Sequence, residues 1–479
     1  MNPDGNVHLI GAGGAGMGAL AHLLLDLGTA VSASDEVAGE GVLDLRGRGL
    51  DVAAGHRAEN LPADVARVVY SLAVPPDNVE RRAARQRGIA ELSYPSAVAR
   101  LLESRRGIGV AGTHGKTTTT ALVAHALRSA GADPSWLIGG VPVDLGGRSG
   151  GAGGSDLLVV EACEYRAAFH AYPLEIGVVL NVEPDHLDWY EDEAGVIDAF
   201  ETFAARPSRL IASRAAASRL GAPGRAALTF DLDDADADVT AVGLTTRAGR
   251  ATFALGGAAT TPPIECPFPG RAFAEDVLAA ATTLSCLGID GARIARGLSS
   301  FSGVGRRLET LATGAVTLIS DYAHHPTELD SVASAMREAA PGRRLVAVFE
   351  PHQVRRTTDF MEGFAAALGR FDVSLVVDVF AAREPGGDAA RMTSERLVEA
   401  VVARGGTARA VGDLTRTTDA ILAEARPGDV ILLLGAGTID GLRHELRLRL
   451  PHSQEHPARG PHDVQDGRDD AALDRAPEP

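Results

Sequence analysis

The first hundred residues alternate short apolar runs with stretches of helical periodicity. Apolar runs of strand length occupy residues 7–10, 31–34 and 67–72, and helical patterns follow residue 16 and cover about 80–87. Such alternation is typical of a parallel sheet covered by helices. We therefore predict an α/β fold with a Rossmann-like first domain over residues 1–106.

The same alternation begins again twice further along the chain. Strands are predicted at 108–111, 157–162 and 176–182, with a helix over about 118–129, and later near 316–320, 345–349, 374–380 and 430–434. We expect a central P-loop ATPase-like α/β domain over 107–302 and a Rossmann-like α/β domain over 303–450.

Three segments depart from this pattern. Residues 146–154 hold six glycines in nine positions, which predicts a loop that is mobile or closes over a ligand. Residues 231–270 carry an acidic run and short β-like stretches, and we interpret the run as a solvated loop. Residues 451–479 lack apolar periodicity and are rich in Pro, Asp and Arg, so we predict a disordered tail.

Composition narrows the class of protein. The chain has 479 residues, too many for one core, and its net charge of −17 argues against general binding of nucleic acid or of an anionic membrane. Three cysteines without paired spacing favour neither a disulfide framework nor a four-cysteine zinc site. No signal peptide or apolar span is evident, so we expect a cytoplasmic protein, as a monomer or a homodimer.

One basic residue stands out among the 46 lysines and arginines. Lys116 is the only lysine, and it ends a glycine-rich turn between a predicted strand and a helix. The turn comprises Gly112, Thr113, His114, Gly115, Lys116, Thr117 and Thr118. Backbone amides of such a loop cradle the phosphates of ATP, the ammonium neutralises them, and the Thr117 hydroxyl is suited to Mg²⁺. Val110 stands where the usual first glycine would be, so the loop is a variant.

A second glycine turn lies near the N-terminus. Gly11, Gly13 and Gly16 form a G-x-G-x-x-G pattern with Gly14 inside it, and Asp35 follows nineteen residues after Gly16. Glycines there allow a diphosphate to approach a helix N-terminus, and the carboxylate can accept a hydrogen bond from a ribose. The motif alone fits a nicotinamide cofactor or a UDP-sugar.

Acidic and imidazole groups follow the central strands. Glu161 ends one predicted strand and His186 follows the next. Side chains at the carboxyl ends of parallel strands beside a phosphate loop are where metal ligands are expected. Glu161, His186 and Thr117 are therefore the candidate Mg²⁺ ligands.

A pair of histidines follows a strand of the third domain. His324 and His325 come before Pro326, and Arg356 follows the next strand. No cysteine or third histidine lies at a zinc-ligand spacing, so contact with nucleotide or substrate is the favoured interpretation. Arginines at such edges can clamp phosphate or carboxylate.

Together these motifs resemble the Mur ligase family over about residues 7–450. The resemblance is carried by Gly11 to Met17, Ser34-Asp35, Gly112 to Thr119, Glu161 to Tyr165, Asn181 to His186, Arg306-Arg307, Ala323 to Glu328, Pro351 to Thr357 and Gly435 to Gly437. Several sister ligases have asparagine at the position of His114. With histidine there, the turn resembles that of the branch that adds L-alanine and that of the ligases that recycle murein peptides.

The resemblance implies an ATP- and Mg²⁺-dependent ligase of cell-wall synthesis, acting on the small molecules UDP-N-acetylmuramate, L-alanine and ATP. It implies that the UDP-sugar lies on the first domain, with Met17 among its contacts. Asp321 is expected near the ATP ribose. Asn181 and Arg307 are expected near the phosphates or an acyl phosphate.

The sequence also departs from the family. After Gly270-Arg271 the family commonly has His and Asn, and a second Asn three residues later, whereas this chain has Ala272, Phe273 and Asp276. Those positions usually help to hold the adenine. The aspartate that usually follows Gly437 is Thr438 here.

Three alternatives stay open at this point. One is a related ligase with another amino acid or peptide as substrate. A second is a nicotinamide-dependent oxidoreductase, which would leave Lys116, Glu161 and His186 without a role. The third is a nucleotide-sugar sensor without turnover.

Overall fold

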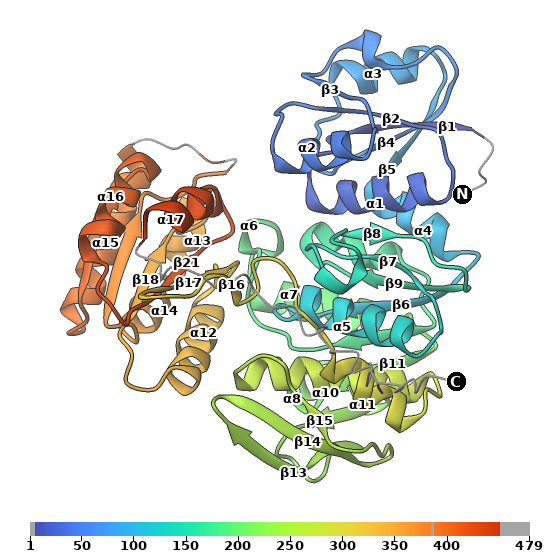
Figure 1. The fold of residues 1–479 in the computed structure, drawn as a ribbon. Helices are drawn as coiled ribbons and strands as arrows, with labels where there is room; N and C mark the ends of the chain where they lie inside the picture. The colour runs from blue at the N-terminus through green and yellow to red at the C-terminus, as the bar shows by residue number, and fades with distance from the viewer. Residues whose placement is uncertain (1–4, 383, 385–387, 451–479) are drawn as a thin grey trace, which may run out of the picture.

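The computed structural model describes residues 5–382, 384 and 388–450, and their strands form three sheets. Figure 1 shows three α/β bodies, coloured blue, cyan to yellow, and orange to red along the chain. This arrangement confirms the predicted α/β fold of three domains. The boundaries at 106–107 and 302–303 stay predictions, and the tail at 451–479 lies outside the described residues.

The first domain has five parallel strands in the order β3-β2-β1-β4-β5. They are β1 (Asn6–Ile10), β2 (Val31–Asp35), β3 (Val52–Ala54), β4 (Val65–Tyr70) and β5 (Ala90–Ser93). The helices are α1 (Ala15–Asp26), α2 (Glu40–Gly47), α3 (Val79–Gln86) and α4 (Tyr94–Leu102). The strand order reverses at β1, and open α/β sheets bind ligands at the carboxyl ends beside such a point.

The second domain is built on ten strands in the order β15-β14-β13-β12-β11-β10-β6-β9-β7-β8. They are β6 (Arg106–Ala111), β7 (Ser135–Leu137), β8 (Gly150–Gly151), β9 (Leu157–Glu161), β10 (Ile176–Val179), β11 (Arg209–Ser213), β12 (Leu228–Asp231), β13 (Val239–Arg247), β14 (Arg250–Gly257) and β15 (Ile264–Glu265). The helices are α5 (Lys116–Ser129), α6 (Leu187–Tyr190), α7 (Glu193–Ala204), α8 (Arg214–Arg219), α9 (Gly221–Arg225), α10 (Arg271–Cys286) and α11 (Gly291–Ser299). The strands that carry the site, β9, β6 and β10, are parallel neighbours, so their carboxyl ends meet.

The glycine-rich segment 146–154 differs from the expected mobile or ligand-covering loop. Gly150 and Gly151 form β8, which pairs with Trp136 and Leu137 of β7. A Cβ added at Gly150 would lie 2.0 Å from the Ala19 carbonyl oxygen of α1. The absence of side chains here lets the second domain pack closely against a helix of the first.

The third domain has six strands in the order β16-β17-β21-β18-β19-β20, all parallel except the edge strand β16. They are β16 (Glu309–Ala312), β17 (Thr317–Asp321), β18 (Leu345–Phe349), β19 (Val373–Val377), β20 (Ala408–Gly412) and β21 (Val430–Leu434). The helices are α12 (Pro326–Ala339), α13 (Val354–Asp359), α14 (Met361–Leu368), α15 (Asp388–Ala403), α16 (Leu414–Glu424) and α17 (Arg443–Arg449).

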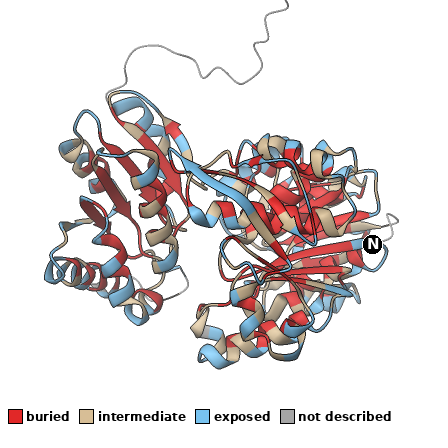
Figure 2. Cartoon of the chain, turned by 90° about the horizontal axis from the view of Figure 1, so that it is seen from below, coloured by how far each residue is buried: buried red, intermediate tan, exposed pale blue. Residues whose placement is uncertain are grey.

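Burial follows the strands. Figure 2 shows the buried residues concentrated in the sheets, with exposed residues on the outer helices and on the β13–β14 hairpin. Strands β18 and β21 are buried at every position, as expected when helices cover both faces of a parallel sheet. Among the described residues, none of the helices combines the length and apolar character needed to cross a bilayer.

Candidate active site

The glycine turn of the first domain lies between β1 and α1. Gly11 has a φ of 81°, a left-handed conformation that favours glycine, and the Gly13 amide donates to Asp35 Oδ2 at 2.8 Å. A Cβ added at Gly16 would lie 2.9 Å from the Tyr94 ring, so only glycine fits beside this ring. The turn is compact and suited to the approach of a diphosphate.

Two further residues of this turn have different surroundings. Gly14 caps α1 without offering a side chain to the first-turn amides, which leaves them available to an anion. Met17 is 2% exposed and belongs to the hydrophobic core. The structure therefore places Met17 beneath the turn.

The second glycine turn joins β6 to α5. Gly112 and Gly115 have φ values of 149° and 82°, and Gly115 caps α5. Asn181, which follows β10, holds the turn from outside: its Oδ1 accepts from the His114 amide at 2.8 Å and its Nδ2 donates to the His114 carbonyl at 3.2 Å. The amide side chain thus fixes the backbone that would surround phosphate.

The Lys116 ammonium is turned into this loop. It donates to the carbonyl oxygens of Gly112 and Thr113 and lies 2.9 Å from Glu164 Oε2. Burial lowers the pKa of Lys116, but the Glu164 carboxylate outweighs it and raises the pKa above its usual range. The single lysine is therefore a fixed positive charge at the mouth of the P-loop.

The predicted metal ligands lie in two groups. Thr117 Oγ1 donates to Glu161 Oε1 at 3.0 Å, and Glu161 Oε2 accepts from the Gly139 amide at 2.7 Å. His186 belongs to the other group, in which ligand atoms of Glu164, Asp185 and His186 all lie within 4.8 Å of one another. Carboxylate oxygens at this spacing fit a hard cation such as Mg²⁺.

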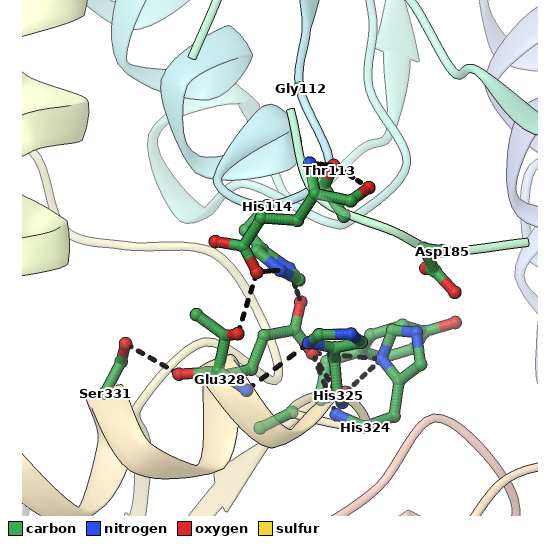
Figure 3. Close-up of polar contacts among 12 residues, drawn as sticks. Gly112, Thr113, His114, Asp185, His324, His325, Glu328 and Ser331 are labelled. Carbon is green, nitrogen blue, oxygen red and sulfur yellow. Dashed lines mark hydrogen bonds and ion pairs between the residues drawn. The ribbon is translucent and has the colours of Figure 1, made fainter. Parts of the chain in front are cut away.

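His114 links the second domain to the third. Its Nδ1 lies 3.1 Å from Glu328 Oε1 of α12 and its Nε2 lies 3.3 Å from Glu183 Oε2, as Figure 3 shows in part. Burial lowers the pKa of His114, but the two carboxylates prevail and raise it to about 9. At neutral pH the residue is an imidazolium between two carboxylates, and the His325 ring lies 4.8 Å away.

The start of α12 is fixed by its own residues. His325 caps the helix and Glu328 returns to the backbone amides of His324 and His325, a capping box with Pro326 in the first turn. Burial lowers the pKa of His324 to about 3, so this imidazole is neutral. Ligand atoms of His114, Glu183 and His325 lie within 4.8 Å of one another, but His114 as an imidazolium has no lone pair to offer a metal ion.

A buried ion pair forms a second link between these domains. Arg356 of α13 lies 2.7 Å from Asp185 Oδ1, and both side chains are less than one-tenth exposed. Burial opposes ionisation of Asp185, but His186 and Arg356 hold the pKa of its carboxyl well below the usual range. The predicted anion-binding arginine is thus paired with Asp185, one of the three residues whose ligand atoms lie close enough to hold a metal ion.

A cavity of about 400 Å³ extends from the P-loop between the second and third domains. Arg307 and Asp321 line it, together with Asn181 and Glu328. Asp321 Oδ2 accepts from the Leu308 amide at 2.7 Å and Oδ1 accepts from the Ala323 amide at 2.8 Å, which fixes this carboxylate at the cavity wall. The volume and the position beside the P-loop suit a nucleoside.

The structure thus brings most of the predicted residues to one cleft. Lys116, Thr117, Glu161, His186, Asn181, Arg307 and the histidine pair surround the P-loop and the cavity. The sequence analysis assigned no role to four carboxylates of the cleft. Glu164 pairs with Lys116, Glu183 and Glu328 pair with His114, and Asp185 pairs with Arg356. Each of the four lies inside a motif that the sequence analysis had already recognised. Their nearness in sequence to the candidate residues was the signal that could have identified them.

Family models match three consecutive parts of the chain. The description "Mur ligase family, catalytic domain" matches residues 6–106, "Mur ligase middle domain" matches 110–284 and "Mur ligase, glutamate ligase domain" matches 306–437. These matches cover most of each sheet described above.

Curated relatives match almost the whole chain. A UDP-N-acetylmuramate--L-alanine ligase of Streptomyces avermitilis is 37% identical over 92% of this chain and 97% of the relative. One of Cutibacterium acnes is 38% identical over 91% of this chain and 94% of the relative.

Solved structures share the fold. The UDP-N-acetylmuramate-alanine ligase MurC of Thermotoga maritima has a TM-score of 0.78 at 24% identity, with 93% of this chain and 99% of that chain covered. MurF ligase of the same organism, solved in complex with ADP, has a TM-score of 0.59 at 16% identity, with 87% and 94% covered. With the two glycine turns, the placed lysine and the relatives in agreement, the chain belongs to the Mur ligase family.

Proposed function

We propose that the protein is an ATP-dependent ligase that joins L-alanine to the lactyl carboxylate of UDP-N-acetylmuramate, a step of peptidoglycan synthesis in the cytoplasm. The observation that carries the proposal is the single lysine of the chain, seated in a P-loop against the Glu164 carboxylate and near that of Glu161. The curated relatives at 37–38% identity are named for this reaction.

The first domain holds the UDP-sugar at its glycine turn. The uncapped first-turn amides of α1 would bind the diphosphate, and the Asp35 carboxylate braces the turn through the Gly13 amide. The Tyr94 ring lies against Gly16 of this turn, and the Glu161 carboxylate of the second domain is close enough to raise the pKa of the Tyr94 hydroxyl.

The second domain holds ATP at the P-loop. Lys116 neutralises the terminal phosphates, so that the lactyl carboxylate can attack the γ-phosphorus and release ADP. An acyl phosphate results, and the amine of L-alanine attacks its carbonyl carbon. Phosphate leaves with the C–O bonding electrons, and the nitrogen loses a proton to give the amide.

Mg²⁺ fits the donor groups found here. Thr117 and Glu161 would hold one ion, and Glu164, Asp185 and His186 offer ligand atoms for another. When bound, the ion would offset the negative charge that accumulates as carboxylate and triphosphate approach. No second lysine is present, so a carbamylated lysine cannot contribute.

The test is phosphate release by the purified chain. We expect release only when UDP-N-acetylmuramate, L-alanine, ATP and Mg²⁺ are all present, together with a product that gains the mass of one alanine residue. Release that ignores the amino acid would overturn the proposal.

The identity of the amino acid is tested by the same assay over the twenty common amino acids. A stronger response to another amino acid would make the chain a related ligase of different specificity. Nucleotide-sugar binding without release under any condition would favour the sensor instead.

A further inference from the structure

One arginine of the second domain reaches the glycine turn of the first. Arg166 Nη1 donates to the Leu72 carbonyl at 2.7 Å. Leu72 follows Ser71, and the Ser71 Cβ lies 3.1 Å from the position that a Cβ at Gly11 would take. The Arg166 guanidinium is therefore anchored beside the turn to which we assign the UDP-sugar.

The same arginine is close in sequence to the contacts of the P-loop. Arg166 comes two residues after Glu164, whose carboxylate lies 2.9 Å from the Lys116 ammonium. Two residues of backbone span at most about 7 Å, so Arg166 cannot be far from this ion pair. Its side chain thus lies between the two turns whose ligands must react with each other.

The backbone that carries Arg166 is strained. Arg166 and Ala167 have φ values of 53° and 54°, in the left-handed region that residues with a side chain rarely adopt. The Tyr190 hydroxyl of α6 donates to the Glu164 carbonyl and accepts from the Ala167 amide at 3.3 Å, so it holds the backbone on both sides of Arg166. Strain of this kind persists only where the surrounding structure compensates for it, and it is concentrated at ligand-binding sites.

Two aromatic rings restrict the position of the guanidinium. Arg166 Cζ lies 5.4 Å from the centre of the Tyr165 ring and 5.7 Å from that of the Trp189 ring. Rings at these distances attract a guanidinium and limit its rotamers, so the charge is held in place before a ligand arrives. Because Trp189 is 49% exposed, a ligand can reach this group from solvent.

Arg166 has no anionic partner within the described part of the chain. No carboxylate of those residues lies within 4.0 Å of its guanidinium. The bond to the Leu72 carbonyl is its only hydrogen bond to them, and its Nε is enclosed without a partner. A charge held partly out of water without a counter-ion is unfavourable, and an anionic ligand relieves this. The N–H groups of Nη2 remain to bind such a ligand.

The UDP-sugar acid carries two kinds of anion, a diphosphate and a lactyl carboxylate. The uncapped first-turn amides of α1 suit the diphosphate. The carboxylate must lie nearer to the P-loop, because it attacks the γ-phosphorus of ATP. Arg166 lies between the turn and the P-loop, and guanidinium N–H groups match carboxylate oxygens in both charge and geometry.

We propose that Arg166 binds the lactyl carboxylate of the sugar acid and thereby selects this substrate over the parent sugar nucleotide. The inference rests on the proposed function, since it names a specificity residue for that substrate. One carboxylate oxygen accepts from the guanidinium, and the other stays free to attack phosphorus. Arg166 therefore positions the nucleophile, whereas Lys116 neutralises the group that is attacked.

The experiment is calorimetric titration of the full chain with UDP-N-acetylmuramate and with UDP-N-acetylglucosamine, which lacks only the lactyl group. Arg166→Gln keeps hydrogen-bond donors and removes the charge. We expect it to raise the Kd of UDP-N-acetylmuramate about tenfold to hundredfold, the range for a hydrogen bond to a charged group. The Kd of UDP-N-acetylglucosamine should change less than about twofold. Both ligands share the diphosphate and its turn, so a general change in domain packing would affect them equally.

Two further variants serve as controls. Arg128→Gln removes another guanidinium of the second domain, which lies 5.4 Å from the Trp136 ring near the end of α5 remote from the P-loop, and it should change neither Kd. Arg166→Lys keeps the positive charge and should weaken UDP-N-acetylmuramate less than Arg166→Gln does.

The outcomes separate this inference from the proposed function. A preference for the sugar acid that falls in Arg166→Gln supports the inference even if no combination of substrates releases phosphate, a result that would overturn only the proposed function. Equal losses for both ligands would assign Arg166 to the diphosphate and overturn the inference. Unchanged constants in Arg166→Gln, or the same loss in Arg128→Gln, would overturn it as well.

Discussion

Lys116 shows how one charge can determine the chemistry of a site. Its ammonium contacts two loop carbonyls and the Glu164 carboxylate, so its position does not depend on the flexibility of a long side chain. A point charge fixed in this way needs little reorganisation when a phosphoryl group becomes more negative.

We expect Lys116→Ala to lower kcat by at least about 10³-fold, because the variant loses the stabilisation of the transferring phosphoryl group. Phosphate release and calorimetric binding of UDP-N-acetylmuramate are the two measurements. Binding of the UDP-sugar should persist, since its turn lies on another domain. Equal losses in both would contradict the division of roles between the domains.

His114 provides a test by pH. Its pKa of about 9 lies above the ordinary histidine value of 6.5, so its ion pairs with Glu183 and Glu328 stabilise the fold fully below about pH 6.5. That contribution is lost as the pH rises from 6.5 through 9.

In the absence of nucleotide, the thermal midpoint of the unmodified chain should therefore fall more steeply over this range than that of His114→Gln, by roughly 3–6 °C. The glutamine keeps hydrogen-bonding capacity without titrating. Parallel curves for the two proteins would show that the ion pairs contribute nothing to stability.

The residues of the site were predictable where a motif fixed them. Lys116 and Thr117 follow from the glycine turn, and His186 follows from its place after a strand. Glu328 was not predictable as a partner of His114, because the two are 214 positions apart and meet only where domains pack. Met17 stays a predicted neighbour of the UDP-sugar; its side chain is buried in the core, because helical periodicity turns it inward.

Among the elements, the parallel strands were predicted correctly from the sequence, whereas the glycine-rich segment 146–154 was expected to be a loop and contains a strand. Strands such as β18 and β21 are continuous apolar runs, and such runs are specific to sheets buried on both faces. Six of the nine residues in the segment 146–154 are glycines, so the sequence carries no pattern of apolar side chains to reveal that β8 pairs with β7 and packs on α1.

A substitution at β8 tests this packing. In Gly150→Ala the new methyl group would meet the Ala19 carbonyl at 2.0 Å, and backbone cannot move aside as a side chain can. We expect a loss of about 1–3 kcal/mol, seen as a lower thermal midpoint. Gly39→Ala is the control, since nothing lies within 4 Å of its added Cβ and its φ of −81° suits alanine. Equal midpoints for the two variants would count against close packing of the domains at β8.

Over the whole molecule, the third domain is joined to the second by charges from several elements. His114 meets Glu328, Thr327 donates to Glu183, and Arg356 meets Asp185. All three contacts lie around the P-loop. The position of the third domain is therefore coupled to the positions of the side chains in the active site.

Variants of two neighbouring arginines of α13, Arg355 and Arg356, can distinguish this coupling from the general effect of removing a positive charge. Arg356→Ala leaves Asp185 buried and unpaired, which costs about 3–5 kcal/mol for a buried pair. We expect a larger radius of gyration by small-angle scattering and a lower thermal midpoint. Arg355→Ala removes an exposed side chain whose contact with the second domain is a long hydrogen bond to the Leu187 carbonyl at 3.3 Å, so it should change both far less. Similar effects of both changes would argue against the buried pair as the link.

Because the chain has one ε-amino group, that of Lys116, amine chemistry can label it at a single side chain. Apart from the terminal amine, an acylating reagent can form a stable amide at one side chain only, and that side chain contacts Glu164 inside the P-loop. Because this ion pair keeps the amine protonated and unreactive, intact-mass measurement of such labelling would report, molecule by molecule, how often the contact opens, without any engineered probe.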